Sequence, residues 1–163
     1  MIVLRPGTSA DLEDLARLHG ACFSSPWDQV SLAALTAQPN VFTLIATQGG
    51  RARGFVMARV AAGESEILSL GVHPQSRGAG TGAQLVHAAA TQAAEQGATE
   101  IFLEVGEKNQ TARSVYDGLG FRLVGRRKHY YAEAGGESQD GLVLKADLPL
   151  GKVGGQSRGT PLG

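Results

Sequence analysis

One stretch of the sequence, residues 66–84, combines glycines, a cation and the start of a helix in a spacing suited to phosphate. Three glycines stand at alternate positions after Arg77, and because glycine has no Cβ atom the backbone there can approach a ligand closely. The helix expected after them offers unpaired N–H groups and the positive end of its dipole. The stretch therefore predicts a phosphate cradle. Its residues are Arg77, Gly78, Ala79, Gly80, Thr81 and Gly82.

Other structures also place glycines before a helix. A tight turn without any ligand needs only the positive φ that glycine tolerates, and this simpler interpretation stays open for the loop taken alone. The spacing Gly78-x-Gly80-x-x-Ala83 satisfies the loose dinucleotide-binding fingerprint. That fingerprint opens a parallel βαβ unit, however, whereas the strands before this loop are expected to be antiparallel. A P-loop is excluded because the sequence has no Gly-x-x-x-x-Gly-Lys-Ser/Thr.

Glu104 is an acidic residue within the apolar segment 99–105. Removal from water disfavours the charged form of a carboxylate, so a buried glutamate is a candidate proton acceptor. A carboxylate near a strand end that pairs with an arginine would explain the same residue without any chemistry. The residues alone leave both interpretations open.

Two further polar residues belong to the helix expected at residues 110–119. Tyr116 has a phenol that can donate a proton to a departing group, although a tyrosine here could equally pack the helix on the sheet. Asn109 stands at the start of the helix, where asparagine is a routine N-cap.

Four other features are ambiguous. Trp27, the single tryptophan, either anchors a helix to the core or lines a substrate channel. Cys22 is expected to be a small core residue, because no basic neighbour that would activate its thiol is apparent. His19 fits a packed or surface position better than a ligand position. The basic run 126–128, expected between the last two strands, is typical of a solvated face; the alternatives are contact with the acidic end of a coenzyme or with a substrate loop.

Composition limits the class of protein. With 163 residues, 42% of them apolar, the chain is long enough for one domain with its own core, and no apolar run reaches membrane-spanning length. A formal net charge of zero does not favour nucleic acid. One cysteine and no apparent signal peptide suit the cytoplasm. The four histidines share no ligand spacing, so no metal site is expected.

The periodicity of apolar residues predicts mixed helices and strands, and thus an α/β domain, over residues 1–150. The glycine-rich segment 151–163 has little to bury and is predicted to be a flexible tail. A capping-box pattern at Thr8–Asp11 starts the first helix. Gly71 permits a bulge or splay in its strand, and the apolar run 101–103 predicts a central strand buried on both faces. The other expected elements are strands at 2–5, 41–47, 54–61, 66–72, 99–105, 121–124 and 142–148, and helices at 28–37, 82–96 and 110–119.

The element order, with antiparallel strands first and a βαβ crossover after them, resembles that of the GNAT acetyltransferase superfamily over residues 2–150. The spacing Arg77-x-x-Gly80-x-Gly82 is similar to the coenzyme A pyrophosphate loop of that superfamily, with Val72 and Pro74 upstream as expected. Four further matches resemble the ribosomal-protein-alanine N-acetyltransferase family. They are Ser25-Pro26-Trp27, Glu66-Ile67-Leu68-Ser69-Leu70, Leu103-Glu104-Val105 with Asn109, Ala112, Tyr116 and Gly118-Leu119-Gly120-Phe121, and Arg127 with Tyr130-Tyr131 and Asp140.

The resemblance implies a mixed central sheet of about seven strands with a splayed strand pair, and helices on both faces. It implies acetyl-CoA as co-substrate, with Glu104 as the proton acceptor and Tyr116 as the general acid. The residues implied to bind acetyl-CoA are the phosphate cradle, Asn109, Tyr116 and the backbone of Leu70, Gly71 and Val72. Those implied to lie beside the substrate are Trp27, Tyr130 and Tyr131.

The same resemblance implies transfer of an acetyl group to the N-terminal alanine of a small-subunit ribosomal protein, by direct attack in a ternary complex. A peptide α-amino group has a pKa of about 7.7–8.0, so modest help from a base is sufficient. The implied partners are coenzyme A and a protein N-terminus, without membrane or direct nucleic-acid binding, and the oligomeric state is not indicated.

Two alternatives stay open. One is a GNAT enzyme that acts on a small amine or a lysine side chain. The other is a coenzyme A-binding regulatory module without turnover, which the presence of both Glu104 and Tyr116 disfavours. Gly141 stands where the family has alanine after the aspartate, and the loop 132–139 is not diagnostic. Both departures fall near the substrate groove, so the residues support acetyl transfer more strongly than a peptide acceptor.

Overall fold

A computed structural model describes residues 1–132 and 138–151, the side chains of residues 129–132 excepted. The predicted tail therefore lies outside the described residues from residue 152 onward, as do residues 133–137 of the last loop. The elements follow the predicted order. They are β1 (Ile2–Pro6), η1 (Ser9–Asp11), α1 (Leu12–Cys22), α2 (Gln29–Thr36), β2 (Val41–Gln48), β3 (Arg51–Ala61), β4 (Glu64–Val72), η2 (Pro74–Ser76), α3 (Thr81–Glu95), β5 (Glu100–Gly106), α4 (Gln110–Gly118), β6 (Arg122–Ala132) and β7 (Ser138–Asp147).

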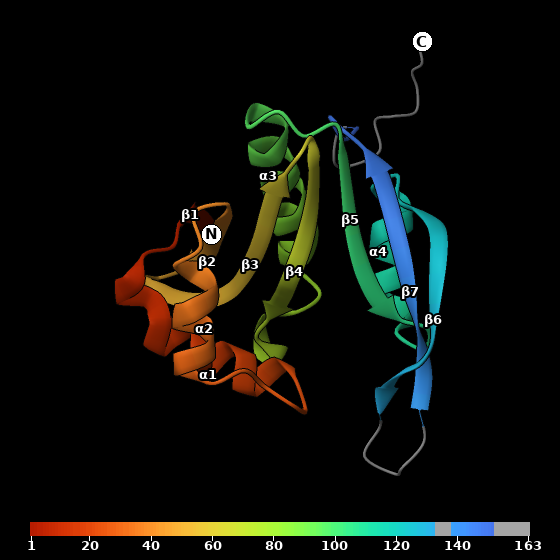
Figure 1. The fold of residues 1–163 in the computed structure, drawn as a ribbon. Coiled ribbons are helices and arrows are strands. Elements are labelled where there is room, and N and C mark those ends of the chain that lie inside the picture. Colours follow the sequence, from red (N-terminus) through yellow and green to blue (C-terminus); the bar gives the residue numbers. More distant parts are fainter. Residues whose placement is uncertain (133–137, 152–163) are drawn as a thin grey trace.

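The strands form one seven-stranded mixed sheet in the order β1-β2-β3-β4-β5-β7-β6. Its only parallel pair among the described residues is β4–β5, and these strands pair only from Glu64–Glu66 with Glu100–Phe102. Beyond that point β4 and β5 diverge, which Figure 1 shows as the gap that splits the sheet. The predicted mixed sheet with a splayed strand pair is confirmed.

The irregularity in β4 lies at Leu68 rather than at Gly71. Ser69 is paired with Met57 and Ile67 with Ala58, so Leu68 is an extra residue in the β3–β4 ladder. Gly71 pairs regularly with Phe55. A Cβ atom on Gly71 would lie 2.8 Å from Cε1 of Phe55 and 2.9 Å from Sγ of Cys22. Glycine is needed there because α1 packs closely on β4, and the prediction of a bulge at Gly71 is wrong.

Helices cover both faces of the sheet. The helices α1 and α2 pack on β2, β3 and β4, whereas α3 and α4 lie on the opposite face (Figure 1). In β5 the residues that face α3 and α4 are buried, but Glu100, Phe102 and Glu104 on the other face are only half-buried. The prediction that this strand is buried on both faces is wrong, because α1 and α2 do not extend over it. The splay thus leaves an open face directly beside β4.

Two local features fix the start of α1. Thr8 caps the preceding turn and forms the predicted capping box with Asp11. Both carboxylate oxygens of Asp11 accept hydrogen bonds from Arg5, at 2.8 and 3.0 Å. The bidentate hydrogen bonds from the Arg5 guanidinium hold the pKa of the Asp11 carboxyl below its usual value.

No helix of the described residues has the length and apolar character needed to cross a membrane.

The last two strands are longer than the sequence predicts. The basic run 126–128, expected between them, forms part of β6, which pairs with β7. Arg126 forms ion pairs with Glu107 and Asp140, both at 2.9 Å. Arg126 is therefore held within the strand by charge pairs.

Candidate active site

Two adjoining cavities occupy the splay between β4 and β5. The first, about 680 Å³, is here called the loop cavity and lies against the loop that precedes α3. The second, about 510 Å³, is called the strand cavity and lies between α1, β4 and β5. The two cavities have five lining residues in common: Cys22, Phe23, Leu70, Asn109 and Tyr116.

The loop cavity contains the predicted phosphate cradle. Gly78 and Gly80 have φ values of +86° and +83°, a backbone conformation that side chains rarely adopt, and the space around each missing Cβ is open. Gly80 is the N-cap residue of α3. Because it has no side chain, it provides no side-chain acceptor for the first N–H groups of that helix. The Thr81 hydroxyl is buried without a hydrogen-bond partner among the described residues. These residues fit a ligand that carries phosphate oxygens.

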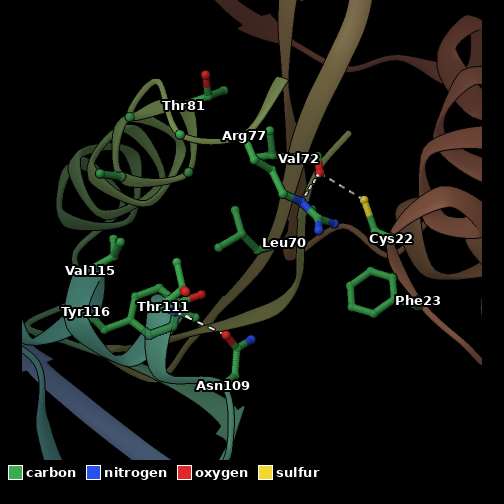
Figure 2. A pocket seen from close by; sticks show the side chains of 16 residues that line it. Cys22, Phe23, Leu70, Val72, Arg77, Thr81, Asn109, Thr111, Val115 and Tyr116 are labelled. Atoms are coloured by element: carbon green, nitrogen blue, oxygen red, sulfur yellow. Dashed lines mark hydrogen bonds between the residues drawn. The ribbon is translucent and has the colours of Figure 1, made fainter. Parts of the chain in front are cut away.

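Five of the six cradle residues line this cavity, and Ala79 does not. Leu70, Gly71 and Val72 line its floor, so the structure brings the predicted cradle and the predicted strand segment together. Figure 2 shows Leu70 between the first turn of α3 and Tyr116 of α4. The cavity is therefore bounded by α3 on one side and by α4 on the other.

Arg77 connects the cradle to α1. Its Nε donates to the Val72 carbonyl at 2.9 Å, and the Cys22 thiol donates to the same carbonyl at 3.4 Å (Figure 2). A basic residue thus lies beside Cys22, contrary to the sequence prediction. Burial nevertheless raises the pKa of the Cys22 thiol, with Arg77 opposing the shift only in part, so the thiol stays protonated at neutral pH and is a poor nucleophile.

Asn109 and Tyr116 enter the cavities from α4. Asn109 caps that helix as predicted, because its Oδ1 accepts a hydrogen bond from the Ala112 N–H at 3.2 Å. Tyr116 is buried and its ring lies 5.9 Å from the Phe121 ring. It therefore packs α4 on the sheet and lines both cavities, so the two interpretations of this tyrosine are compatible.

Glu104 lies in β5 and lines the strand cavity. Its side chain is 22% exposed, and Oε1 lies 3.1 Å from Nη1 of Arg127. The arginine-paired interpretation of Glu104 is therefore correct for one of its oxygens. The other oxygen, Oε2, is buried without a hydrogen-bond partner among the described residues. One carboxylate oxygen therefore remains able to accept a proton from a group in the cavity.

The predicted substrate residues are only partly testable. Trp27 is 37% exposed at the strand cavity, and its ring stacks on the His19 ring with centroids 4.8 Å apart. It anchors the α1–α2 connection and lines a cavity, as both interpretations required. Tyr130 and Tyr131 belong to β6, but their side chains lie outside the described residues.

Sequence reasoning missed the polar pair behind the strand cavity. His19 is buried, as a packed residue should be, and its Nδ1 accepts a hydrogen bond from the Trp27 N–H at 3.0 Å. Its Nε2 lies 3.1 Å from the Ser69 hydroxyl. Burial lowers the pKa of the His19 imidazole. No local signal links residues fifty positions apart, so only the packing of α1 on β4 reveals this pair.

Comparison with known proteins decides what this site belongs to. The profile of the acetyltransferase (GNAT) family matches residues 12–121. The chain belongs to this family. The predicted GNAT fold and the predicted acetyltransferase activity are thereby confirmed, and the splayed strand pair is the feature around which this family member builds its cavities.

Individual relatives resemble the whole GNAT chain. The [ribosomal protein bS18]-alanine N-acetyltransferase of Haemophilus influenzae is 25% identical over 148 residues, which is 91% of this chain and 100% of that protein. The crystal structure of the ribosomal-protein-S18-alanine N-acetyltransferase from Escherichia coli superposes with a TM-score of 0.85 at 21% identity, covering 94% of this chain and 98% of that one. These matches bear out the predicted resemblance to that family of enzymes.

A second similar structure contains acetyl-CoA. Arabidopsis thaliana NAA60 in complex with acetyl-CoA has a TM-score of 0.80 at 20% identity and covers 91% of this chain and 99% of that chain. At this identity the likeness concerns the fold.

Within residues 1–132 and 138–151, no group of three or more His, Cys, Asp or Glu side chains is arranged to hold a metal ion.

Proposed function

We propose that this GNAT protein is an acetyl-CoA-dependent N-α-acetyltransferase that acetylates the N-terminal alanine of a protein such as ribosomal protein bS18. The observation that carries the proposal is the continuity of the two cavities. A thioester bound in the loop cavity and an amine bound in the strand cavity would meet beside Leu70 and Tyr116, which line both.

The loop cavity has the features that a coenzyme A pyrophosphate requires. Backbone N–H groups at the start of α3 and the charge of Arg77 can bind phosphate oxygens without help from a metal. Coenzyme A carries amides along its pantetheine arm, and the splay leaves the β4 backbone beyond Glu66 without a β5 partner to receive them. Nε of Arg77 donates to the Val72 carbonyl, which leaves the N–H groups of the two Nη atoms as donors for phosphate oxygens.

The proposed reaction proceeds by direct attack within a ternary complex. Glu104 accepts a proton from the acceptor amine through its unpartnered oxygen, Oε2. The amine nitrogen then forms a bond to the acetyl carbon while the bond between that carbon and sulfur breaks. Tyr116 donates its phenolic proton to the departing thiolate. The nitrogen loses its second proton to solvent as it becomes an amide, the Tyr116 phenolate regains a proton from solvent, and Glu104 releases the first proton to solvent. Cys22 takes no covalent part, because burial keeps its thiol protonated.

The proposed acceptor follows from the relatives. The Haemophilus influenzae and Escherichia coli proteins are named for the alanine of ribosomal protein bS18, and matches to them extend over nine-tenths of this chain. A ribosomal acceptor would place the reaction in the cytoplasm. Trp27 at the entrance to the strand cavity supports a role in holding the acceptor, and the backbone position of Tyr130 and Tyr131 in β6 is consistent with the substrate role proposed for them.

Intact-mass spectrometry tests the proposal. The enzyme is mixed with acetyl-CoA and a peptide that begins with alanine and contains one internal lysine. We expect a single added acetyl group, assigned by fragmentation to the α-amine. A matched peptide with a blocked N-terminus is the control and should stay unmodified. Faster labelling of the blocked peptide, or of small amines, would replace the proposal with the alternative of a GNAT enzyme that acts on a lysine side chain or a small amine.

A further inference from the structure

Ser69 and Glu104 lie at the same level on opposite sides of the splay. Glu66 of β4 is the last residue paired with β5, and its partner is Phe102. Counting onward, Glu104 is two residues beyond Phe102, and Ser69 is three residues beyond Glu66 with Leu68 as the extra residue of the bulge. Both side chains line the strand cavity. The bulge therefore turns a hydroxyl toward the gap opposite the proposed base.

The hydrogen bonds of His19 fix the direction of that hydroxyl. Because Nδ1 accepts the Trp27 N–H, the proton of the neutral ring is on Nε2, which then donates to Ser69 Oγ at 3.1 Å. The Ser69 oxygen is thus an acceptor toward His19, and its own hydrogen must point elsewhere. Among the described residues no acceptor for that hydrogen is found, although Ser69 is only 9% exposed.

We infer that Ser69 is an acceptor-binding residue whose hydroxyl donates a hydrogen bond to the main-chain carbonyl of the first residue of the acceptor peptide. The inference rests on the proposed function, which places the acceptor amine beside Glu104. In a peptide N-terminus the carbonyl is separated from that amine by one Cα atom, so both groups fit opposite walls of one cavity. His19 is a positioning residue that acts through Ser69.

The consequence is a chemical criterion for the acceptor. A peptide or amino-acid amide has a carbonyl beside its amine, whereas a simple alkyl amine does not. A buried polar group that is left without a partner costs more free energy than a surface one, so the site should select against amines that lack this carbonyl. The relevant substrate class is an amine on the carbon next to an amide carbonyl.

The test compares two acceptors in Ser69→Ala and wild-type enzyme. One is an alanine-initiated peptide, and the other is 2-aminopropane, which keeps the amine and methyl groups of alanine and lacks the carbonyl. One lost hydrogen bond should lower kcat/KM for the peptide by about fivefold to tenfold. The change for 2-aminopropane should be less than about twofold, since no carbonyl is lost. Taking each acceptor's variant-to-wild-type ratio removes the difference in amine basicity.

Ser65→Ala is the matched control. Ser65 lies in the same strand and is buried, but its hydroxyl donates to the Glu100 carbonyl at 3.0 Å and does not line the strand cavity. It should lower activity toward both acceptors by the same factor, through the fold alone. A selectivity change in Ser65→Ala equal to that in Ser69→Ala would overturn the inference.

Two His19 variants separate its two hydrogen bonds. Asparagine can retain an acceptor near the Nδ1 position, and glutamine can retain a donor near the Nε2 position. We expect His19→Asn to reproduce the peptide-selective loss of Ser69→Ala, and His19→Gln to recover most of it. Combining His19→Asn with Ser69→Ala should add no further selectivity. Full additivity of the two losses would remove His19 as the residue that positions Ser69.

A binding measurement keeps the inference separate from the proposed function. Trp27 is the only tryptophan and is part of the strand cavity, so its fluorescence can report peptide binding without turnover. Ser69→Ala should raise the peptide Kd by about fivefold to tenfold. If the wild type acetylates the peptide but this Kd and the kinetic ratio are unchanged, the inference fails and the proposed function stands. If the wild type prefers another acceptor, the proposed function fails, and the peptide Kd values measured by Trp27 fluorescence still decide the inference.

Discussion

The loop cavity and the strand cavity are built from different parts of the chain. The loop cavity consists largely of backbone and small side chains from two short segments, residues 70–72 and 77–83, with Arg77 as its full charge. The strand cavity consists of larger side chains from α1, the α1–α2 connection, β4, β5 and α4. Glycine spacing and the start of a helix specify the cradle of the loop cavity locally. The strand cavity exists only after distant elements pack together.

This difference explains how one fold can keep a donor site and vary its acceptor. Backbone N–H groups at a helix start bind phosphate whatever the neighbouring side chains are. Replacing Ser69, Trp27 or Glu104 would change the strand cavity without altering the cradle, because none of them lines the loop cavity. Donor binding and acceptor choice should therefore be separable by mutation.

The largest effect is expected on the acceptor side, from Glu104→Gln. Loss of the base should lower kcat for an alanine-initiated peptide by about a hundredfold and leave the KM for acetyl-CoA within about twofold. The loss should be greatest below the α-amine pKa of about 7.7–8.0, where the amine is protonated, and should shrink at higher pH where the free amine predominates. Steady-state kinetics across pH measures this dependence.

Glu107→Gln provides the control for charge. Glu107 pairs with Arg126 at 2.9 Å, as Glu104 pairs with Arg127 at 3.1 Å, but it lines neither cavity. It should keep the wild-type pH profile. A parallel profile in Glu104→Gln would show that this carboxylate is not the base.

On the donor side the sharpest change is Arg77→Ala. Loss of a charge-assisted contact should raise the KM for acetyl-CoA by about tenfold and leave the peptide KM unchanged. The effect should diminish with added salt, which screens an exposed cation. Arg122→Ala removes another exposed arginine, paired with Asp147 at 3.4 Å and far from the cradle in the fold. An equal rise of the acetyl-CoA KM in both variants would exclude a specific role for Arg77.

The same contrast explains what the sequence could predict. The order of the elements, the capping box at Thr8, the Asn109 cap and the glycine loop before α3 depend on neighbouring residues, and all are present. The position of the bulge could not be predicted, because Leu68 is set apart only by its register against β3. Gly71 suggested a bulge or splay, whereas glycine is required there because a Cβ atom would lie too close to Phe55 and Cys22.

Residues on β5 and β6 show a second limit. The length of β6 depends on its pairing with β7, whereas the basic run 126–128 was expected to lie between the last two strands. The Arg127–Glu104 pair joins β6 to β5, which are consecutive strands in the sequence but are separated in the sheet by β7. Burial of Glu104 was overestimated, because whether α1 and α2 extend over β5 depends on helix packing rather than on the composition of the strand.

A stability comparison tests the packing of α1 on β4, two elements that line both cavities. Gly71→Ala would place a Cβ atom within 2.9 Å of two side chains of α1 and β3, and relieving that overlap should cost about 1–3 kcal/mol of the free energy of unfolding. Gly20→Ala in α1 meets nothing within 4 Å and should instead stabilise the helix by about 0.5–1 kcal/mol. Denaturant unfolding measures both. Equal values would mean that α1 does not pack on β4 as described.

The smallest effect is a pH dependence of stability that comes from the strand cavity. The rings of Phe23, Trp27 and Phe55 surround His19, and Ser69 is its polar partner. The pKa of the buried imidazole is lowered from its ordinary value of 6.5, so the unfolded chain binds a proton at higher pH than the folded protein. Stability should therefore be full above about pH 7.5 and should fall as pH decreases through 6.5, by at most about 1.4 kcal/mol per pH unit.

Comparison of His19→Gln with the wild type isolates this contribution, because the other titratable groups that line the strand cavity, Cys22, Glu104 and Tyr116, are the same in both proteins. The variant should lose less stability between pH 7.5 and pH 5. His87→Gln, a change on α3 outside both cavities, should follow the wild type. Parallel curves for wild type and His19→Gln would mean that the imidazole is protonated without penalty. The hydrogen bond from the Trp27 N–H to Nδ1 would then not hold the ring neutral, and the direction assigned to the Ser69 hydroxyl would lose its basis.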